Sequence, residues 1–144
     1  MKQKSEGAVR VDVIRSHKDL IVWQKSVALA SRVYAATRKL PSEERFGLTR
    51  QLRRASVSIA SNIAEGSARR SRSEFRHFLH IARGSLSELE TQMMIAIDQR
   101  FIVSHESPIA EIAEVGRLLN GLIRSLASSS TAAHAKACSP IVSR

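Results

Sequence analysis

Apolar residues recur every three or four positions through four long segments of this 144-residue chain, and this period constrains the fold more than any other sequence feature. Side chains spaced in this way lie on one face of an α-helix. The six glycines and three prolines are also too few for a turn-rich β fold. The sequence therefore predicts an all-α protein.

Start and stop signals divide the chain into four predicted helices. Residues 16–19 and 71–74 have capping-box spacing, which satisfies free backbone N–H groups at a helix start. Pro41 and Gly66 are expected to end the first and second helices, and Pro108, preceded by a serine, to begin the fourth. The predicted helices span about residues 17–40, 45–65, 72–100 and 108–127.

The length of the chain suits one domain, and the helices account for residues 16–127. Because short connections join the helices, the simplest fold is an antiparallel up-down-up-down four-helix bundle. Residues 1–15 and 128–144 have weak periodicity, so we interpret them as a flexible N-terminal arm and a flexible C-terminal tail. No run approaches the ~20 apolar residues of a membrane span, and the lone Cys138 fits a reducing cytosol. These features predict a cytoplasmic protein without membrane contact.

The periodic positions also predict the face of each helix that lies in the core. The third helix has the most regular pattern, a heptad seam in steps of four and three. The predicted core residues are Leu20, Trp23, Val27, Ala30, Tyr34 and Thr37 in the first helix, Leu48, Leu52, Ala55, Ile59 and Ile63 in the second, Phe75, Leu79, Ala82, Leu86, Leu89, Met93 and Ala96 in the third, and Ile112, Val115, Leu119, Leu122 and Leu126 in the fourth.

The formal net charge of +10 is concentrated in one part of the chain. Residues 45–83 hold nine arginines against two glutamates, whereas residues 84–115 hold six acidic residues against one arginine. This distribution favours a continuous arginine-rich end and flank, where the guanidinium fork suits bidentate contact with phosphate. The candidate nucleic-acid-binding residues are Arg50, Arg53, Arg54, Arg69, Arg70, Arg72, Arg76 and Arg83.

Two functions fit an arginine surface of this kind. The first is binding of RNA or DNA through phosphates, with a strong dependence on salt. Aromatic residues are only 4% of the chain, and Trp23, Tyr34 and Phe75 fall on apolar stripes, so no stacking platform for single-stranded bases is expected. The second function is a protein-interaction scaffold whose basic surface docks an acidic protein partner. The arginines can equally form a solvated face or pair with nearby glutamates.

A polar seam and a second apolar face indicate contacts beyond one bundle. Polar residues follow heptad steps beside the apolar stripe of the second helix, and small residues in the third helix would let another helix approach closely. One bundle has too few partners to bury two faces of the third helix, so we expect a homo-oligomer. The candidate residues of the oligomer interface or polar seam are Gln51, Ser58, Asn62, Glu65, Ile81, Gly84 and Ser85.

Catalytic and metal-binding constellations are sparse. Glu74 and His77 have the Glu-x-x-His spacing of di-iron bundles, but such a site needs a second copy and further carboxylates. His77 and His80 alone are too few for zinc. The sequence contains no phosphate-binding glycine loop and no nucleophile elbow. We expect no catalytic residue, no metal and no cofactor, and therefore a non-enzymatic protein.

Ordered motifs on the second and third helices resemble a known family. The segments SIASNIAEG at residues 58–66 and IARGS at residues 81–85 carry the resemblance, with further matching positions at residues 19–25, 48–55, 73–75, 78–79 and 88–92. Over about residues 17–126 the chain resembles the four-helix-bundle family of 23S rRNA intervening sequence proteins. Ala60 stands where that family often has proline, and residues 98–102 depart from its usual Leu-Gly-Tyr-containing end of the third helix.

The resemblance implies an antiparallel four-helix bundle that assembles as a ring, commonly a homopentamer. It also implies a non-enzymatic role. The family is similar to the accessory variability proteins of diversity-generating retroelements, which are basic barrels that bind nucleic acid and a reverse transcriptase. RNA or DNA, a protein partner and other copies of the chain are therefore the expected partners.

Overall fold

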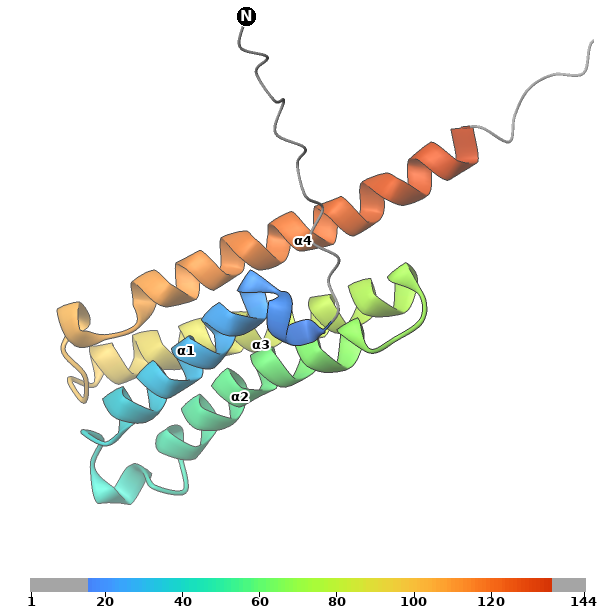
Figure 1. Ribbon diagram of the computed structural model, residues 1–144. Helices are drawn as coiled ribbons and strands as arrows, with labels where there is room; N and C mark the ends of the chain where they lie inside the picture. The colour runs from blue at the N-terminus through green and yellow to red at the C-terminus, as the bar shows by residue number, and fades with distance from the viewer. Residues whose placement is uncertain (1–15, 136–144) are drawn as a thin grey trace, which may run out of the picture.

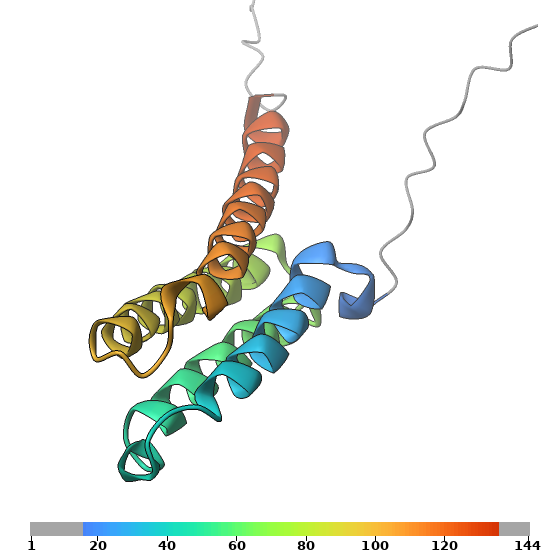
Figure 2. The ribbon, with the colours of Figure 1, turned by 90° about the vertical axis from the view of Figure 1, so that its left-hand side faces the viewer.

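Four antiparallel α-helices make up the part of the chain that the computed structural model describes, residues 16–135, with side chains described to residue 128 (Figure 1). The helices are α1 (Ile21–Thr37), α2 (Leu48–Ser67), α3 (Arg72–Asp98) and α4 (Ile109–Ala135), with 3-10 turns at His17–Asp19, Ser42–Glu44 and Ser104–Glu106. The α2 helix packs most extensively on α3, and α1 and α4 complete the bundle (Figure 2). The predicted all-α four-helix bundle is confirmed.

The predicted stripes of α2, α3 and α4 form the core. In α3 the seam from Leu79 to Ala96 is buried, and in α2 Leu52, Ile59 and Ile63 are completely covered. Leu119 is likewise covered in α4. These positions fit the prediction because each stripe stays on one face of its helix and meets a neighbour across the bundle axis.

The predicted core face of α1 is confirmed at its two ends, where Leu20 and Thr37 are buried, and is wrong between them. Leu29 and Val33 are buried, whereas Val27 and Tyr34 are 40% and 41% exposed. The buried stripe lies beside the predicted one on the helix. It contains Ser26, which is buried although its side chain is polar. Its hydroxyl donates to the carbonyl oxygen four residues earlier over 2.6 Å, so the buried polar group keeps a hydrogen bond.

Gly66 does not end α2, contrary to the prediction. The helix continues through it to Ser67, and Gly66 is buried against α3. A Cβ atom at this position would lie 2.7 Å from Phe78 Cβ and 2.9 Å from Phe75 Cδ2. The missing side chain therefore lets α3 approach α2 closely where the two helices join.

The ends of α3 follow capping rules. At its start the Ser71 hydroxyl accepts a hydrogen bond from the Glu74 N–H over 3.1 Å, as the capping-box spacing predicts. At its end Arg100 adopts a φ of 60°, and the Phe101 N–H donates to the Ala96 carbonyl over 2.9 Å. Arg100 thus has the left-handed backbone conformation that glycine usually adopts after a helix. The α3 helix ends two residues before the predicted end.

The prediction that the fourth helix ends at about residue 127 is wrong. The α4 helix continues to Ala135, and its C-terminal part projects beyond the other three helices in both views (Figures 1 and 2). Residues 128–135 contain no glycine or proline and three alanines, so nothing in them breaks the helix. The predicted arm at residues 1–15 and the rest of the predicted tail, residues 136–144, lie outside the described residues. No helix in the described part is long and apolar enough to cross a membrane.

Candidate nucleic-acid interface

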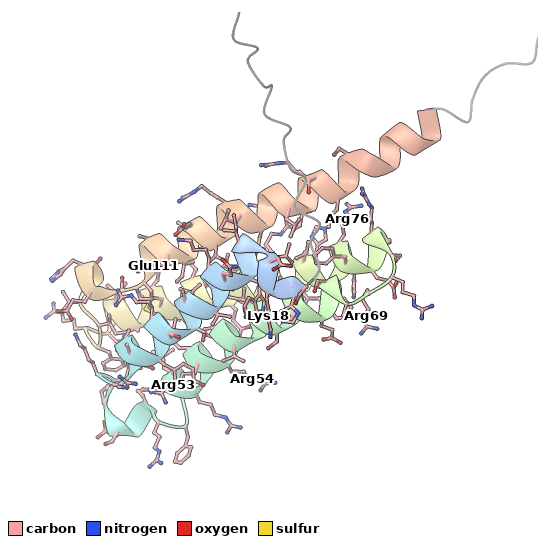
Figure 3. All side chains as sticks on the ribbon, viewed as in Figure 1. Lys18, Arg53, Arg54, Arg69, Arg76 and Glu111 are labelled. Carbon is pink, nitrogen blue, oxygen red and sulfur yellow. The ribbon has the colours of Figure 1, made fainter. Side chains whose placement is uncertain are left out.

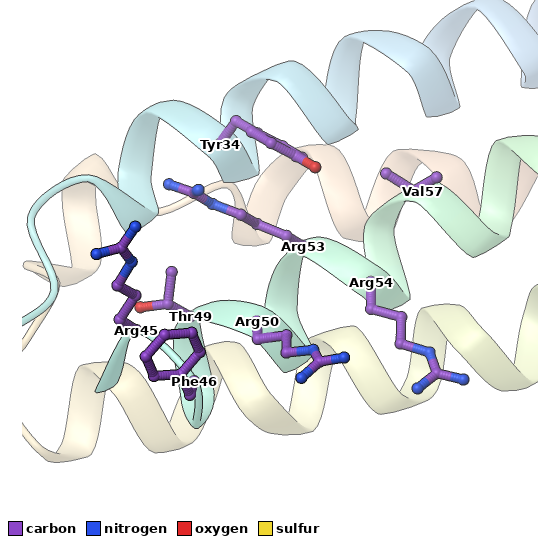
Figure 4. A pocket seen from close by; sticks show the side chains of 8 residues that line it. All are labelled: Tyr34, Arg45, Phe46, Thr49, Arg50, Arg53, Arg54 and Val57. Atoms are coloured by element: carbon purple, nitrogen blue, oxygen red, sulfur yellow. The ribbon is translucent and has the colours of Figure 1, made fainter. Parts of the chain in front are cut away.

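A shallow groove lined by arginines opens where the C-terminal end of α1 lies beside the N-terminal half of α2 (Figure 4). Its volume is about 560 Å³, within the range of many ligand-binding clefts. Tyr34 comes from α1, and the other lining residues come from the following connection and from α2. We call this surface the α1–α2 groove, and its lining residues are Tyr34, Arg45, Phe46, Thr49, Arg50, Arg53, Arg54 and Val57.

Arg53 forms a fixed wall of the groove. Its guanidinium carbon lies 4.7 Å from the ring centroid of Tyr34, and its Nε donates to Thr37 Oγ1 over 2.9 Å. Figure 4 shows the side chain extending from α2 toward Tyr34. Both contacts join α2 to α1, so they stabilise the packing of the two helices. They also fix the orientation of the Arg53 side chain in the absence of a ligand.

Phe46 stands in the connection before α2 and is 79% exposed. The guanidinium carbon of Arg45 lies 5.6 Å from its ring centroid. Burial of a phenylalanine ring typically contributes about 1.5–3 kcal/mol to stability, and a ring this exposed forgoes most of that contribution. The ring therefore belongs to the surface of the groove and not to the core.

Arg50 and Arg54 supply uncompensated positive charge. Both side chains are exposed, and neither has a hydrogen bond or an ion pair within the described part of the chain. Figure 4 shows both pointing away from Tyr34. Glu44 in the adjoining connection does not line the groove, and its Oε2 accepts the Leu48 N–H over 2.9 Å at the start of α2. The groove therefore presents a net positive potential to solvent.

A second group of arginines lies at the turn between α2 and α3. Arg69 pairs with Glu65 over 2.9 Å and covers the Phe78 ring at 4.8 Å. Arg70 and Arg72 are exposed, and neither side chain has a bonded partner among residues 16–135. This turn therefore also carries free positive charge, but it forms no cavity comparable with the α1–α2 groove.

Two further candidate arginines, Arg76 and Arg83, lie on α3. Arg76 is half-buried, and its Nε has no hydrogen-bond partner in the part of the chain that the structure describes. Arg83 contacts Asn120 Oδ1 over 3.4 Å and His80 Nδ1 over 3.1 Å, which directs it toward α4. Arg76 is therefore less available to a ligand than the exposed arginines, and Arg83, although exposed, already contacts other side chains.

The eight predicted arginines do not form one continuous surface. Arg53 and Arg54 lie toward one end of α2, and Arg69 and Arg76 lie toward the other (Figure 3). At 1.5 Å per residue, Arg54 and Arg69 are separated by about 22 Å along the helix axis. The reason is in the sequence, since residues 55–64 between them carry no charged side chain.

The polar residues predicted beside the apolar stripe of the second helix form a hydrogen-bonded network with α3 of the same chain. Ser58 Oγ and Ser85 Oγ are 3.0 Å apart, and Asn62 Nδ2 donates to Ser58 Oγ over 3.0 Å. Gln92, which the sequence did not single out, is buried and donates to Gln51 Oε1 over 3.4 Å. A cavity of about 320 Å³ opens along this seam.

The other predicted interface residues lie apart from this network. Glu65 pairs with Arg69. Ile81 is 40% exposed, and a Cβ atom added at Gly84 would meet no described atom within 4 Å. Ile81 and Gly84 therefore lie on an outer surface of α3 that the described residues leave uncovered.

Titratable groups do not assemble into a reaction centre in the described residues. Within residues 16–135, no group of three or more His, Cys, Asp or Glu side chains is arranged to hold a metal ion. The pKa of Glu106 is lowered by the hydrogen bond that Lys39 donates to it and by the attraction of the Lys39 charge. Neither residue lines the α1–α2 groove, and the pair joins the end of α1 to the connection before α4, so it bears on stability.

Arg45 and Phe46 are groove residues that the sequence did not single out. The sequence pattern placed both at the start of the predicted helix 45–65, whereas in the structure they lie in the connection before α2, which begins at Leu48. Phe46 falls outside the apolar stripe of that predicted helix, and this mismatch was the available clue that its ring would not enter the core.

Comparisons with known proteins give a family and a fold match. The family model described as 23S rRNA-intervening sequence protein matches residues 18–121, which is more than half of the chain. The chain is also similar to a solved crystal structure from Bacteroides thetaiotaomicron, a protein with unknown function from the S23 ribosomal protein family. Sequence identity is 28% and the TM-score is 0.67, and the match covers 72% of this chain and 98% of the other. No curated protein matches the chain.

Proposed function

The chain belongs to the 23S rRNA-intervening sequence protein family, and from this premise we propose that it binds RNA or DNA through phosphate contacts in the α1–α2 groove. One observation carries the proposal: within the described residues, Arg50 and Arg54 extend guanidinium groups without a bonded partner beside a groove that no carboxylate lines. Guanidinium groups held beside a concave surface suit the oxygens of a phosphodiester backbone.

Binding in this proposal involves no catalysis. The lining residues are arginines, two aromatic residues, a threonine and a valine, so the groove offers charge and ring surface but no carboxylate or imidazole for proton transfer. We place the protein in the cytoplasm and assign it no cofactor and no membrane partner.

We also propose that copies of the chain assemble into a homo-oligomer, for which the family resemblance implies a ring, commonly a pentamer. Ile81 and Ile95 are 40% and 47% exposed on nearly the same face of α3, and exposed apolar residues on one helix face support contact with another copy. Light scattering on the purified protein measures the mass, and a monomer at micromolar concentration would contradict this part of the proposal.

A protein scaffold is the second candidate function. The groove's positive charge complements an acidic protein as well as a phosphate backbone, and the exposed Val27 on α1 and Val57 on α2 would add apolar contact area. Mass spectrometry of proteins that co-purify at low salt, alongside sequencing of nucleic acid from the same sample, separates the two candidates.

The direct test is a salt titration of binding to fluorescently labelled hairpin RNA and duplex DNA. We compare the wild type with the double variant Arg50→Ala/Arg54→Ala. Loss of two phosphate contacts should reduce the slope of log K against log salt by about 1.4–1.8. Affinity at low salt should fall for all sequences, because phosphate contacts carry no base specificity.

The matched control is Arg70→Ala/Arg72→Ala, which also removes two exposed charges without a bonded partner in the described residues. It should change the slope less than the groove variant does. Equal effects from both variants would show that a diffuse charge, and not the groove, attracts the ligand. No binding, or an affinity independent of ionic strength, would overturn the nucleic-acid proposal.

A further inference from the structure

We propose that the α1–α2 groove selects single-stranded nucleic acid by stacking an unpaired base on Phe46 while the neighbouring arginines hold the flanking phosphates. This inference rests on the proposed function and specifies its ligand. It also corrects the expectation that the protein has no aromatic platform for bases. That expectation followed from assigning the aromatic residues to core stripes, and it left Phe46 out of account.

The exposure of Phe46 is the first observation. The ring is 79% exposed, and it lies in a connection between helices where it has no helical stripe to complete. The Arg45 guanidinium carbon lies over the ring, 5.6 Å from its centroid, so a cation accompanies one face of a ring that still faces solvent. An exposed ring beside an arginine offers a nucleotide both a stacking surface and a phosphate contact.

The fixed wall of the groove is the second observation. Tyr34 is 41% exposed and is held by Arg53, which is itself hydrogen-bonded to Thr37. These contacts cross from α2 to α1, so the wall is ordered without a ligand. A ligand entering the groove therefore meets one rigid side, and binding need not order these side chains first.

The charge distribution is the third observation. Arg50 and Arg54 lie one helical turn apart on α2 and both line the groove. They flank the ring surface on the side away from Tyr34 (Figure 4). No carboxylate from the described part of the chain lines the groove, so its charge suits an anionic strand and repels a basic segment.

These features favour a single strand over a duplex. In a double helix the base faces are stacked on one another, so a protein ring can reach a base face only where the base is unpaired. Stacking of an aromatic side chain on a base changes affinity by about 5- to 150-fold when the ring is removed. Because every base has a π face, the selection should be for strandedness and not for sequence.

The test measures binding of short labelled single-stranded RNA, single-stranded DNA and duplexes of the same sequences by fluorescence anisotropy. Phe46→Ala should weaken binding of both single strands by about 5- to 150-fold and change duplex affinity by less than twofold. Phe46→Trp, which keeps a ring, should retain single-strand binding. Val103→Ala is the control, because Val103 is 52% exposed in the connection between α3 and α4, outside the groove.

A fluorescent base analogue placed in the single strand gives a second readout. Stacking on Phe46 should quench 2-aminopurine when the wild type binds, and Phe46→Ala should abolish that quenching. Comparison of the RNA and DNA strands shows whether the sugar matters, since both present the same base faces and phosphates.

The outcomes separate this inference from the proposed function. If Phe46→Ala leaves single-strand affinity unchanged while the salt-dependent binding persists, the stacking inference is overturned and the phosphate-led function stands. If the wild type binds neither strands nor duplexes, the proposed function fails. If Phe46→Ala changes the mass measured by light scattering, the ring belongs to a contact between copies, which also overturns the inference.

Discussion

Replacing Gly66 by alanine should destabilise the protein even though alanine is the better helix former. Gly66 lies inside α2, and an added Cβ atom would lie 2.7 Å from Phe78 Cβ and 2.9 Å from Phe75 Cδ2. Phe78 Cβ is attached directly to the α3 backbone, so relief of the clash requires α3 to move away from α2. The side chain cannot rotate out of the way.

The size of the effect follows from two opposing terms. Alanine should contribute about 1 kcal/mol over glycine through helix propensity. Overpacking of a tight contact costs about 1–3 kcal/mol, and a clash with an atom fixed to the backbone belongs at the upper end. The net loss for Gly66→Ala should be about 2 kcal/mol. Gly84→Ala is the matched control on α3, because its Cβ would meet nothing within 4 Å and the variant should gain about 1 kcal/mol.

Thermal unfolding followed by circular dichroism measures both variants at equal protein concentration. For a chain of this size, about 1 kcal/mol corresponds to roughly 4 °C in Tm. The Tm of Gly66→Ala should fall by about 8 °C, and that of Gly84→Ala should rise by about 4 °C. Light scattering checks that both variants keep the wild-type mass. A Gly66→Ala variant as stable as Gly84→Ala would refute the close approach of α2 and α3.

Three further changes test local features of the fold. Glu106→Gln should lower stability at pH 7, because Lys39 lowers the folded pKa of Glu106 below its ordinary value of 4.5 and so stabilises the fold above that pH. Urea unfolding should show this difference vanishing as the pH falls through the lowered pKa, and a difference that persists in acid would contradict it. Arg53→Ala should cost about 1–2 kcal/mol in urea unfolding, whereas Arg50→Ala should stay within about 0.5 kcal/mol of the wild type. Arg100→Gly should raise stability by about 1 kcal/mol, since glycine accepts the positive φ that Arg100 adopts, and an unchanged urea midpoint would argue against that strain.

The core of the bundle was predictable where one stripe was clearly the most apolar. The seam from Leu79 to Ala96 in α3 contains only apolar residues at heptad spacing, so the face that it buries was determined by the sequence. In α1 two neighbouring stripes compete, and the one that contains Ser26 is buried. Sequence patterns count serine as polar, whereas the helix satisfies its hydroxyl with its own backbone and makes its burial inexpensive.

The candidate site was predictable only in part. The concentration of arginines in residues 45–83 was visible in the sequence, as was the polar seam of Ser58 and Asn62. The sequence did not show that the arginines form two separate groups. The distance between the groups depends on the uncharged middle of α2 continuing as one unbroken helix. The groove itself needs Tyr34 from α1 beside Arg53 from α2, a pair that no local pattern connects.

The sequence by itself determined an all-α bundle, the buried faces of α2, α3 and α4, and the excess of positive charge. It could do so because helical period and charge are local properties of the chain. Only the tertiary structure decided that Gly66 would serve close packing instead of ending a helix, and that Phe46 would remain exposed beside a basic groove. Both outcomes depend on what a second helix places next to the residue. A residue's neighbours across the bundle, and not its own pattern, determine whether it packs, caps or contacts solvent.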